Sequence, residues 1–507
     1  MIMHTVRVKL KTTAYQESVI DRRFHALSHI HNVLVKHVRK RLVQMEHDSE
    51  YILLLEEIRQ MAKKERLSAA EKHRRKEVRD RLKQIRKDYG LTEYALQSYI
   101  KVCGKQYRKL LSAHQVQKEA TRIWRSVEKY LFSNGKQIHF KKYRDFRTIG
   151  GKSNTNGAKF QKETMSFSWL GLSLSCVVPR REKDRLYLEE ALSHDVRYCE
   201  IERLMFPNGW HYYAVIYLSG DAPCKQKQIG TGTMGIDPGV SSIAAASDTL
   251  LVLQELAPDV SEYNRRIIKL QKYMDASRRA TNPKKFQPNG TINRANHDPW
   301  VLSKGYKKAR NRLKSVYRQK TAYTKQSHEI LCNHLLSDSK TFVVEKMVYH
   351  ALQRRAKKTE RSDTLSVIKD NKGRERKVRK YKKKKRFGRT LNNRSPSLFL
   401  QILQRKCLLY GCVYTEIDTQ AFKASQYDHV RDTYQKIPLK QRFKEIGGQQ
   451  VQRDLYSAFL IRNTDDNLKA PNRELCSQKF NDFVVMQNQL IEQMKHDGLS
   501  MKQCFGF

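Results

Sequence analysis

Three acidic residues in the second half of the chain stand where carboxylates could share metal ions. Asp237 and Glu345 each end a short apolar run, and Asp454 opens a run with helical spacing. Three carboxylates held together repel one another and retain protons, and a divalent cation relieves that repulsion. Two Mg²⁺ or Mn²⁺ ions about 4 Å apart can activate water and stabilise the leaving oxygen in phosphodiester hydrolysis. The three acids therefore predict a metal-dependent site for cutting a phosphodiester bond.

Taken singly, each of these acids has a simpler structural explanation. A strand that ends in Asp-Pro-Gly is most often a turn, a Glu after two valines most often lies at the surface, and an Asp at a helix start most often caps the helix. Their order favours the chemical interpretation. The strand with Asp237, a long insertion, the strand with Glu345, a basic insertion and the helix with Asp454 follow one another in a strongly basic chain.

Apolar runs and helical repeats around the three acids predict the elements that hold them. Compact β-like runs fill 231–255, and a further apolar run leads into Glu345. The spacing of apolar residues predicts a strand at 412–418 and helices at 258–282, 303–336, 396–409 and 450–463.

The first half of the chain changes character twice. Residues 5–12 alternate apolar and basic side chains, as a half-buried strand does, and helical spacing follows over 15–132. Within it, 62–88 is so charged that it predicts a solvated helical hairpin or an RNA-facing arm. Short β-like runs return at 135–225, with Pro-Asn-Gly at 207–209 as a hairpin turn. The expected arrangement is a β-barrel-like domain interrupted by a helical domain.

The charge of the chain points to a polyanionic partner. Lys and Arg total 100 against 51 acids, which leaves +49 over 507 residues. A compact protein with this charge repels itself unless a polyanion neutralises it, and nucleic acid is the obvious one. A ribosomal-type structural protein fits the length and the acids less well. Binding at a membrane surface is not favoured, because the chain has no long basic amphipathic stretch with an aromatic face.

The cysteines and the apolar runs indicate a reduced cytoplasmic setting. The nine cysteines are scattered without a Cys-x-x-Cys pair, so they predict neither a disulfide framework nor a simple zinc ribbon. The start of the chain lacks the apolar core of a secretory signal. No window reaches the roughly 18 apolar residues of a membrane span, and no membrane partner is expected.

Three segments around the acids resemble the motifs of a known family. Gly235–Gly239 is similar to the first RuvC motif of the TnpB transposon-associated nucleases and the related type V CRISPR effectors. Phe342–Met347 is similar to the second motif and Gln452–Ala458 to the third. The likeness is specific in this half and extends loosely from the first strand to about residue 463. It implies an RNA-guided nuclease that binds a structured guide RNA, reads a short flanking motif and cuts target DNA.

The resemblance also implies a multidomain α+β fold with a particular division. Its parts are a β-barrel-like wedge domain at 1–12 and 135–228, a helical recognition domain at 13–134, an RNase H-like (RuvC) α/β nuclease domain at 229–463 and a C-terminal tail at 464–507.

One departure from the family concerns zinc. Its members usually carry a zinc ribbon of two cysteine pairs before the third motif, and here 419–449 contains no cysteine. Asp428 and His429 are adjacent and lack cysteine partners, which makes a poor zinc site. Mg²⁺ or Mn²⁺ is therefore the expected metal, and zinc is not expected.

The most basic segment, 354–394, is expected to contact nucleic-acid backbone and to become ordered with it. Tyr349 and Tyr381 flank it and could stack on bases, although ordinary solvated tyrosines are the simpler interpretation. Arg453, beside Asp454, could stabilise transition-state charge or contact phosphate. The candidate backbone contacts are Arg354, Arg355, Lys382, Lys383, Lys384, Lys385 and Arg386.

Two other functions remain open at this stage. A guide-bound protein could occupy DNA and repress without cutting, although a pure binder does not need three metal-ligand acids. A resolvase or transposase could act without RNA, although the large basic helical lobe argues mildly against it. The sequence leaves the guide, the flanking motif and the oligomeric state undetermined.

Overall fold

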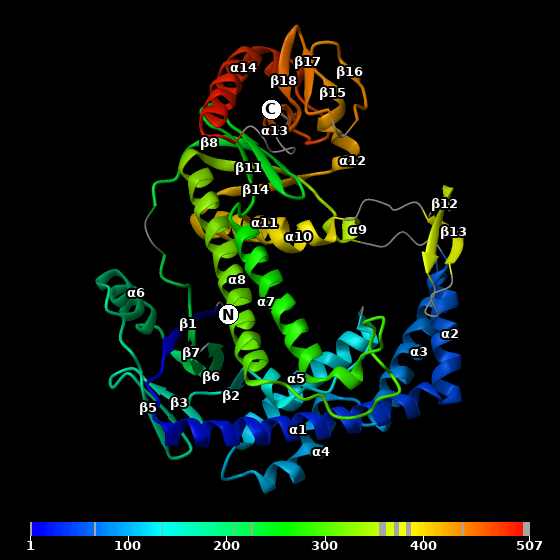
Figure 1. The fold of residues 1–507 in the computed structure, drawn as a ribbon, viewed down its shortest axis with the longest axis vertical. Helices are drawn as coiled ribbons and strands as arrows, with labels where there is room; N and C mark the ends of the chain where they lie inside the picture. Colours follow the sequence, from blue (N-terminus) through cyan, green and yellow to red (C-terminus); the bar gives the residue numbers. More distant parts are fainter. Residues whose placement is uncertain are drawn as a thin grey trace. The chain divides into compact units, whose positions relative to one another are not determined.

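The computed structural model describes residues 3–64, 67–133, 135–206, 208–224, 227–353, 361–369, 375–381, 387–438 and 441–499. The chain divides into two compact units, Met1–Pro223 and Cys224–Phe507, and each has a mixed α and β content. Figure 1 shows the elements of each unit.

In the larger sheet of the first unit, the first strand of the chain pairs with the last strand of the unit. Strand β1 alternates exposed and buried residues, as expected, and pairs antiparallel with β7 from Met3 opposite Ser219 to Lys9 opposite Tyr213. The four-stranded sheet has the order β1-β7-β6-β2, and a second sheet has the order β3-β4-β5. The strands are β1 Met3–Lys9, β2 Thr148–Gly150, β3 Ala158–Gln161, β4 Ser166–Trp169, β5 Leu172–Ser175, β6 Val196–Phe206 and β7 Gly209–Ser219.

A block of helices lies in the chain between β1 and β2. The first of them begins with a capping box between Thr13 and Gln16 and buries one apolar side along most of its length. The helices of this unit are α1 Ala14–Glu46, α2 Ser49–Ala62, α3 Ala69–Asp88, α4 Glu93–Gln106, α5 Ala113–Phe132 and α6 Glu182–Leu192, with a 3₁₀ turn η1 Tyr143–Asp145.

The charged stretch 62–88, predicted as a solvated helical hairpin or an RNA-facing arm, contains α3 and only the last residue of α2, so the helical pair begins earlier, at Ser49. Only three side chains of α3 are buried, and ion pairs connect the two helices. Arg74 pairs with Glu57 at 2.8 Å and Arg81 with Glu50 at 2.5 Å. Exposed ion pairs of this kind add little stability. Because so few α3 side chains are buried, most of the surface of this helix is available to a partner.

The second unit is built on a five-stranded sheet with the order β10-β9-β8-β11-β14. Strands β8, β9 and β10 form an antiparallel meander, and β11 runs parallel to both β8 and β14. Its five strands are β8 Gly232–Pro238, β9 Ser242–Ala246, β10 Leu251–Glu255, β11 Ser339–Glu345 and β14 Val413–Ile417.

Helices cover both faces of this sheet, because its strands alternate between two apolar cores. Phe342 and Val344 of β11 enter one core with α8 and α11, and Val343 enters the other with α13 and α14. The helices of this unit are α7 Val260–Thr281, α8 Lys304–Asp338, α9 Tyr349–Gln353, α10 Gly388–Arg394, α11 Pro396–Tyr410, α12 Thr419–Phe422, α13 Arg453–Arg462 and α14 Arg473–His496, with 3₁₀ turns η2 Pro283–Lys285 and η3 Ala424–Gln426.

The structure differs from the sequence-based expectation in three segments. The region 419–449, expected as a loop, forms two small antiparallel hairpins, the second of which reaches the start of the third motif at Gln452. The polar tail, where a weak helix near 480–495 was expected, contains the longer helix α14, and the described part of the basic segment 354–394 includes another hairpin. These hairpins are β12 Arg361–Lys369 with β13 Glu375–Tyr381, β15 Tyr427–Asp428 with β16 Thr433–Tyr434, and β17 Phe443–Ile446 with β18 Gln449–Gln452.

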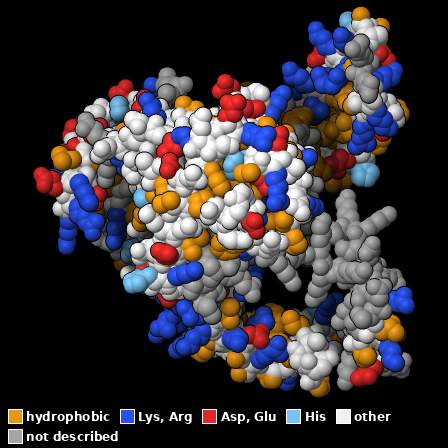
Figure 2. Space-filling model, turned by 90° about the horizontal axis from the view of Figure 1, so that it is seen from above, with side chains coloured by type: hydrophobic (Ala, Val, Ile, Leu, Met, Phe, Trp, Pro, Cys, Tyr) orange, Lys and Arg blue, Asp and Glu red, His pale blue; other side chains and the backbone are white. Residues whose placement is uncertain are grey.

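The surface carries its excess positive charge in separate groups. Figure 2 shows Lys and Arg side chains in several places on the visible face, with acidic side chains among them. None of the helices in the described ranges is both long enough and apolar enough to cross a bilayer.

Candidate active site

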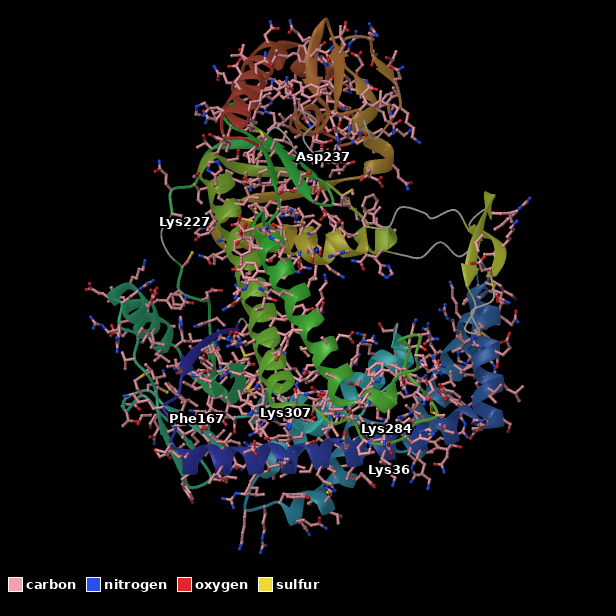
Figure 3. The ribbon with its side chains drawn as sticks, in the orientation of Figure 1. Lys36, Phe167, Lys227, Asp237, Lys284 and Lys307 are labelled. Atoms are coloured by element: carbon pink, nitrogen blue, oxygen red, sulfur yellow. The ribbon has the colours of Figure 1, made fainter. Side chains whose placement is uncertain are left out.

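The two strand-borne acids lie side by side at one edge of the central sheet. In the parallel pair of β8 and β11, Ile236 is opposite Val344, so the next residues, Asp237 and Glu345, end neighbouring strands. Parallel strands present their carboxyl ends at the same edge, which is where both acids were expected. Figure 3 shows Asp237 on its strand.

Strand alternation turns these acids toward α13. Ile236 and Val344 belong to the core on the α8 side, so the next residues, Asp237 and Glu345, face the opposite side of the sheet. That side is covered by α13, whose first turn contains Asp454. The three predicted acids therefore come from two strand ends and one helix start on the same side of the sheet.

A glycine in the first motif sets the approach of α13 to the sheet. A Cβ atom at Gly235 would lie 2.2 Å from the carbonyl oxygen of Ala458 and 2.3 Å from the backbone nitrogen of Arg462. No side chain fits between these backbones, so α13 packs directly on β8. Residue 235 is two positions before Asp237, and the glycine therefore fixes the separation of strand and helix beside the site.

The electrostatics show that the acids influence one another. Burial raises the pKa of Asp237 well above its ordinary value, and the charges of Glu345 and Asp454 raise it further. Burial also raises the pKa of Glu345, and hydrogen bonds with Asp237 and Thr419 partly offset that rise. Both acids keep some solvent-accessible surface although protein atoms surround them. They form a densely packed acidic pair that a substrate or an ion can reach.

Asp454 is held by two arginines. Nη1 of Arg442 donates to its Oδ2 at 3.1 Å, and Nε of Arg453 donates to its Oδ1 at 3.3 Å. Both carboxylate oxygens are thus engaged, and across the described ranges no three Asp, Glu, His or Cys side chains converge on a single cation position. A three-carboxylate metal site would place the ion on a carboxylate that these two arginines also hold, and each of its oxygens has a further lone pair.

The donor set fits a divalent metal by its chemistry. Mg²⁺ and Mn²⁺ prefer hard oxygen ligands, and all three acids supply them. Burial raises the pKa of both Asp237 and Glu345, and the charge of Glu345 raises that of Asp237 further, which is the kind of strain that a dication relieves. Asp237, Glu345 and Asp454 are the residues that would hold such an ion.

Two residues at the site extend the sequence prediction. Arg442 was not predicted, because it lies on the far side of a hairpin turn from Asp454 and no motif marks it. Tyr349, considered as a base-stacking residue, donates its hydroxyl to the carbonyl of Pro238 at 3.4 Å. Burial raises the pKa of Tyr349, and the charge of Asp237 raises it further because the tyrosine lies beside the acidic pair.

Asp428 and His429, the stray candidates for zinc, have other partners in the structure. Oδ1 of Asp428 accepts from the backbone nitrogens of Val430 at 3.0 Å and Arg431 at 3.2 Å, which closes the turn after β15. His429 is 1% exposed, and its Nδ1 lies 2.7 Å from the hydroxyl of Tyr456.

The predicted backbone contacts of the basic segment lie outside the described residues. These are Arg354, Arg355, Lys382, Lys383, Lys384, Lys385 and Arg386.

Comparisons with known proteins find similarity at the level of solved structures. No protein-family model matches this chain, and no curated protein matches it. A Cas12f1 complex with single guide RNA and target DNA aligns with 92% of this chain and 99% of its own, at 10% identity and a TM-score of 0.42. A CRISPR-Cas12f ternary complex aligns with 90% of this chain and 82% of its own, at 14% identity and a TM-score of 0.26.

A Cas12i variant in complex with crRNA and double-stranded DNA aligns with 94% of this chain and 65% of its own, at 9% identity and a TM-score of 0.23. These neighbours are type V CRISPR effector complexes, the group that the three sequence motifs resemble.

Proposed function

We propose that this chain is an RNA-guided DNA endonuclease that cuts at a RuvC-type site on an RNase H-like fold. The observation that carries the proposal is the placement of three acids on the central sheet. Asp237 lies at the end of β8, Glu345 ends β11, and Asp454 lies in the first turn of α13, which follows β18. The strand order, with three antiparallel strands beside two parallel ones, supports an RNase H-like sheet.

Each residue at the site has a definite part in this chemistry. Asp237, Glu345 and Asp454 would hold a divalent ion, with Asp454 giving up its contact with Arg442 or Arg453. When bound, Mg²⁺ or Mn²⁺ supplies an activated water and neutralises charge on the scissile phosphate. The arginine released by Asp454 is then free to contact that phosphate, because guanidinium binds phosphate and carboxylate oxygens in the same way.

The net charge of the chain and its resemblance to RNA-guided nucleases both favour a guide RNA as the partner. At +49 the protein binds nucleic acid without sequence information, and no sequence motif of a helix-turn-helix or zinc-finger reader occurs. A guide supplies the sequence and opens the duplex at little net cost, because the heteroduplex is about as stable as the DNA it replaces. The β-barrel-like wedge of the first unit and its helices would hold that heteroduplex and read a short flanking motif.

The site is tested by Asp237→Ala in the full chain loaded with its RNA. The variant should lose DNA cleavage and keep guide-dependent binding, because the acid holds metal and contacts no base. Asp482→Ala is the matched control, since Asp482 is an exposed acid on α14 with no hydrogen bond or ion pair among the described residues. Cleavage by Asp237→Ala at a tenth of the normal rate or better would contradict the assignment.

The guide is tested by exchanging it. The RNA that co-purifies is removed with ribonuclease, an RNA with a changed guide end is supplied, and the cuts are mapped. Cuts should move with the guide. Efficient site-specific cutting without RNA would favour a resolvase-like enzyme, and guide-dependent binding without cutting in Mg²⁺ or Mn²⁺ would favour a repressor.

A further inference from the structure

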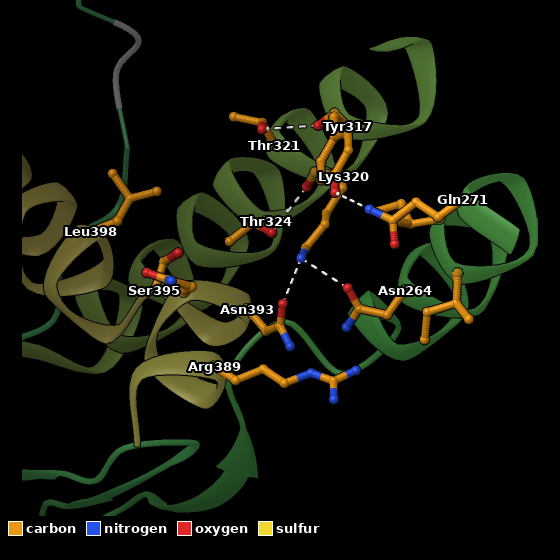
Figure 4. Close-up of a pocket in the computed structure, with 13 residues that line it drawn as sticks. Asn264, Gln271, Tyr317, Lys320, Thr321, Thr324, Arg389, Asn393, Ser395 and Leu398 are labelled. Carbon is orange, nitrogen blue, oxygen red and sulfur yellow. Dashed lines mark hydrogen bonds between the residues drawn. The ribbon is translucent and has the colours of Figure 1, made fainter. Parts of the chain in front are cut away.

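A second polar cavity lies in the nuclease unit and shares no residue with the acidic site. It has a volume of about 730 Å³, within the range of ligand-binding pockets. Helices α7, α8, α10 and α11 form its walls (Figure 4). Its lining includes two cations, four side-chain amides and three large aliphatic side chains, and it contains no acid.

The polar groups of this cavity are arranged around one lysine. Nζ of Lys320 donates to Oδ1 of Asn264 at 2.9 Å and to Oδ1 of Asn393 at 2.6 Å. Figure 4 shows the ammonium group between these two amides. A lysine ammonium has three protons, so one remains for another acceptor.

Beyond these two bonds, the cavity still offers a set of unused hydrogen-bond donors. The amide oxygens of Asn264 and Asn393 are occupied by Lys320, and their NH₂ groups have no acceptor in the described part of the chain. Arg389 lines the same cavity, is exposed, and has no hydrogen bond or ion pair among the described residues. The remaining proton of Lys320, two amide NH₂ groups and a guanidinium group are all donors, and together they select an anion with several oxygens.

The rest of the lining favours a flat apolar group beside that anion. Ile267, Ile268 and Leu398 supply aliphatic surface, and Tyr317 adds an aromatic ring that is 45% exposed. Nε2 of Gln271 donates to the Tyr317 hydroxyl at 3.3 Å, which orients the ring at the cavity (Figure 4). Nucleotides combine a phosphate with a planar base, and bases stack on aromatic side chains.

We propose that this cavity binds one nucleotide of an unpaired nucleic-acid strand, with its phosphate on the donor group around Lys320 and its base or sugar against Tyr317 and the aliphatic wall. The strand is either the RNA or a single strand of DNA, since both present the same phosphate and base chemistry. The inference goes beyond cleavage and rests only on nucleic-acid binding by this chain. An acidic peptide would satisfy the donors but would leave the aromatic and aliphatic wall without a matching group.

The experiment is site-resolved photo-cross-linking on the full chain without divalent metal, so that no cleavage occurs. The probes are a short single-stranded RNA with 4-thiouridine and a DNA of the same sequence with 4-thiothymidine. Adducts are mapped to peptides by mass spectrometry, and an adduct at Tyr317 is expected. An adduct with one probe alone identifies the strand that uses the cavity, and adducts with both show that the pocket accepts either sugar.

Two variants should remove this adduct. Thr321→Trp fills the cavity from an exposed position on α8, and Arg389→Ala removes the unpaired cation. Arg389→Ala should lower the yield at Tyr317 by about tenfold, the effect of losing a charge-assisted contact, and Thr321→Trp should lower it by blocking entry of the nucleotide. The matched controls are Gln319→Trp and Arg312→Ala. Both change exposed residues of α8 that do not line the cavity, and both should leave the yield unchanged.

The outcomes separate this inference from the proposed function. Cross-links elsewhere without one at Tyr317, or a Tyr317 adduct that persists in both pocket variants, would overturn the nucleotide pocket and leave the nuclease proposal intact. The absence of any cross-link to the protein would overturn nucleic-acid binding itself. Polyglutamate that removes the Tyr317 adduct while other adducts persist would assign the cavity to an acidic peptide instead.

Discussion

Acid should loosen the second unit through one buried histidine. His429 follows β15 in the segment where the resembled family carries a zinc ribbon, and its ring packs against Phe480 with centroids 4.8 Å apart. The Tyr456 hydroxyl accepts from the His429 backbone nitrogen at 3.3 Å and lies 2.7 Å from Nδ1. The Tyr456 hydroxyl is able to donate its own proton to Nδ1 of a neutral imidazole ring, and Nδ1 then acts as the acceptor.

The magnitude follows from the pKa of this ring. Burial, opposed by Asp428 and assisted by Arg473 and Lys444, lowers the pKa of His429 from 6.5 to about 4. The folded state binds fewer protons than the unfolded state between these two values, so stability rises with pH across that window. Each unit of pKa is worth about 1.4 kcal/mol, so roughly 3 kcal/mol is lost as pH falls from about 6.5 to about 4.

Hydrogen exchange of peptides from α13 and α14 measures this loss, because it reports opening of the unit that contains His429. The comparison variant is His429→Asn, since the Asn amide oxygen can accept from Tyr456 and does not take a proton in this range. The wild-type chain should lose roughly 3 kcal/mol more than the variant between neutral pH and pH about 4. Equal losses in the two proteins would refute the reasoning, because other titrating groups would then account for the acid sensitivity.

Three further predictions concern the buried acid Asp237, the cations at 382–386 and the zinc content of the chain. Asp237→Asn should stabilise the metal-free protein at neutral pH by on the order of 1–3 kcal/mol, since it removes a buried charge beside Glu345 and Asp454; a lower urea midpoint in the presence of EDTA would contradict this. Replacing the cations at 382–386 with Ala should weaken binding to all sequences and flatten its salt dependence, and a loss for one sequence at an unchanged salt slope would refute it. Elemental analysis should find well under one zinc per chain, whereas a stoichiometric zinc ion would show that other ligands hold it.

Local patterns in the sequence were sufficient to place the acids. Helical spacing and apolar runs predicted α7, α8, α11 and α13 to within a few residues. Those patterns placed Asp237 and Glu345 at strand ends, whereas their meeting at one edge depends on the pairing of β8 with β11, a contact between distant parts of the chain. The third acid follows because Asp454 lies in the first turn of its helix, where a carboxylate is favourable.

Contacts between distant residues could not be predicted in the same way. Lys320 meets Asn264 and Asn393 across 56 and 73 residues of sequence, and nothing in the local pattern of any of the three marks the other two. Arg442 reaches Asp454 only because β17 pairs with β18 in a register that places Phe443 opposite Gln452. Helix α14 was underestimated because its polar residues hide an apolar stripe, which includes Phe480 and Phe483.

The pairing of β1 with β7 has a consequence for the time at which the first unit can fold. His4 forms a hydrogen bond to Gly220 across 216 residues, and the whole of β1 waits for residues near 213–219. At about 5–20 residues per second, a ribosome needs roughly 10–40 s to supply the missing strand. During that interval the helices can form from local contacts, while β1 has no sheet neighbour. Synthesis therefore proceeds for most of this unit with a free strand that other chains can reach, and rapid translation or early binding of a chaperone to residues 3–9 should favour correct assembly.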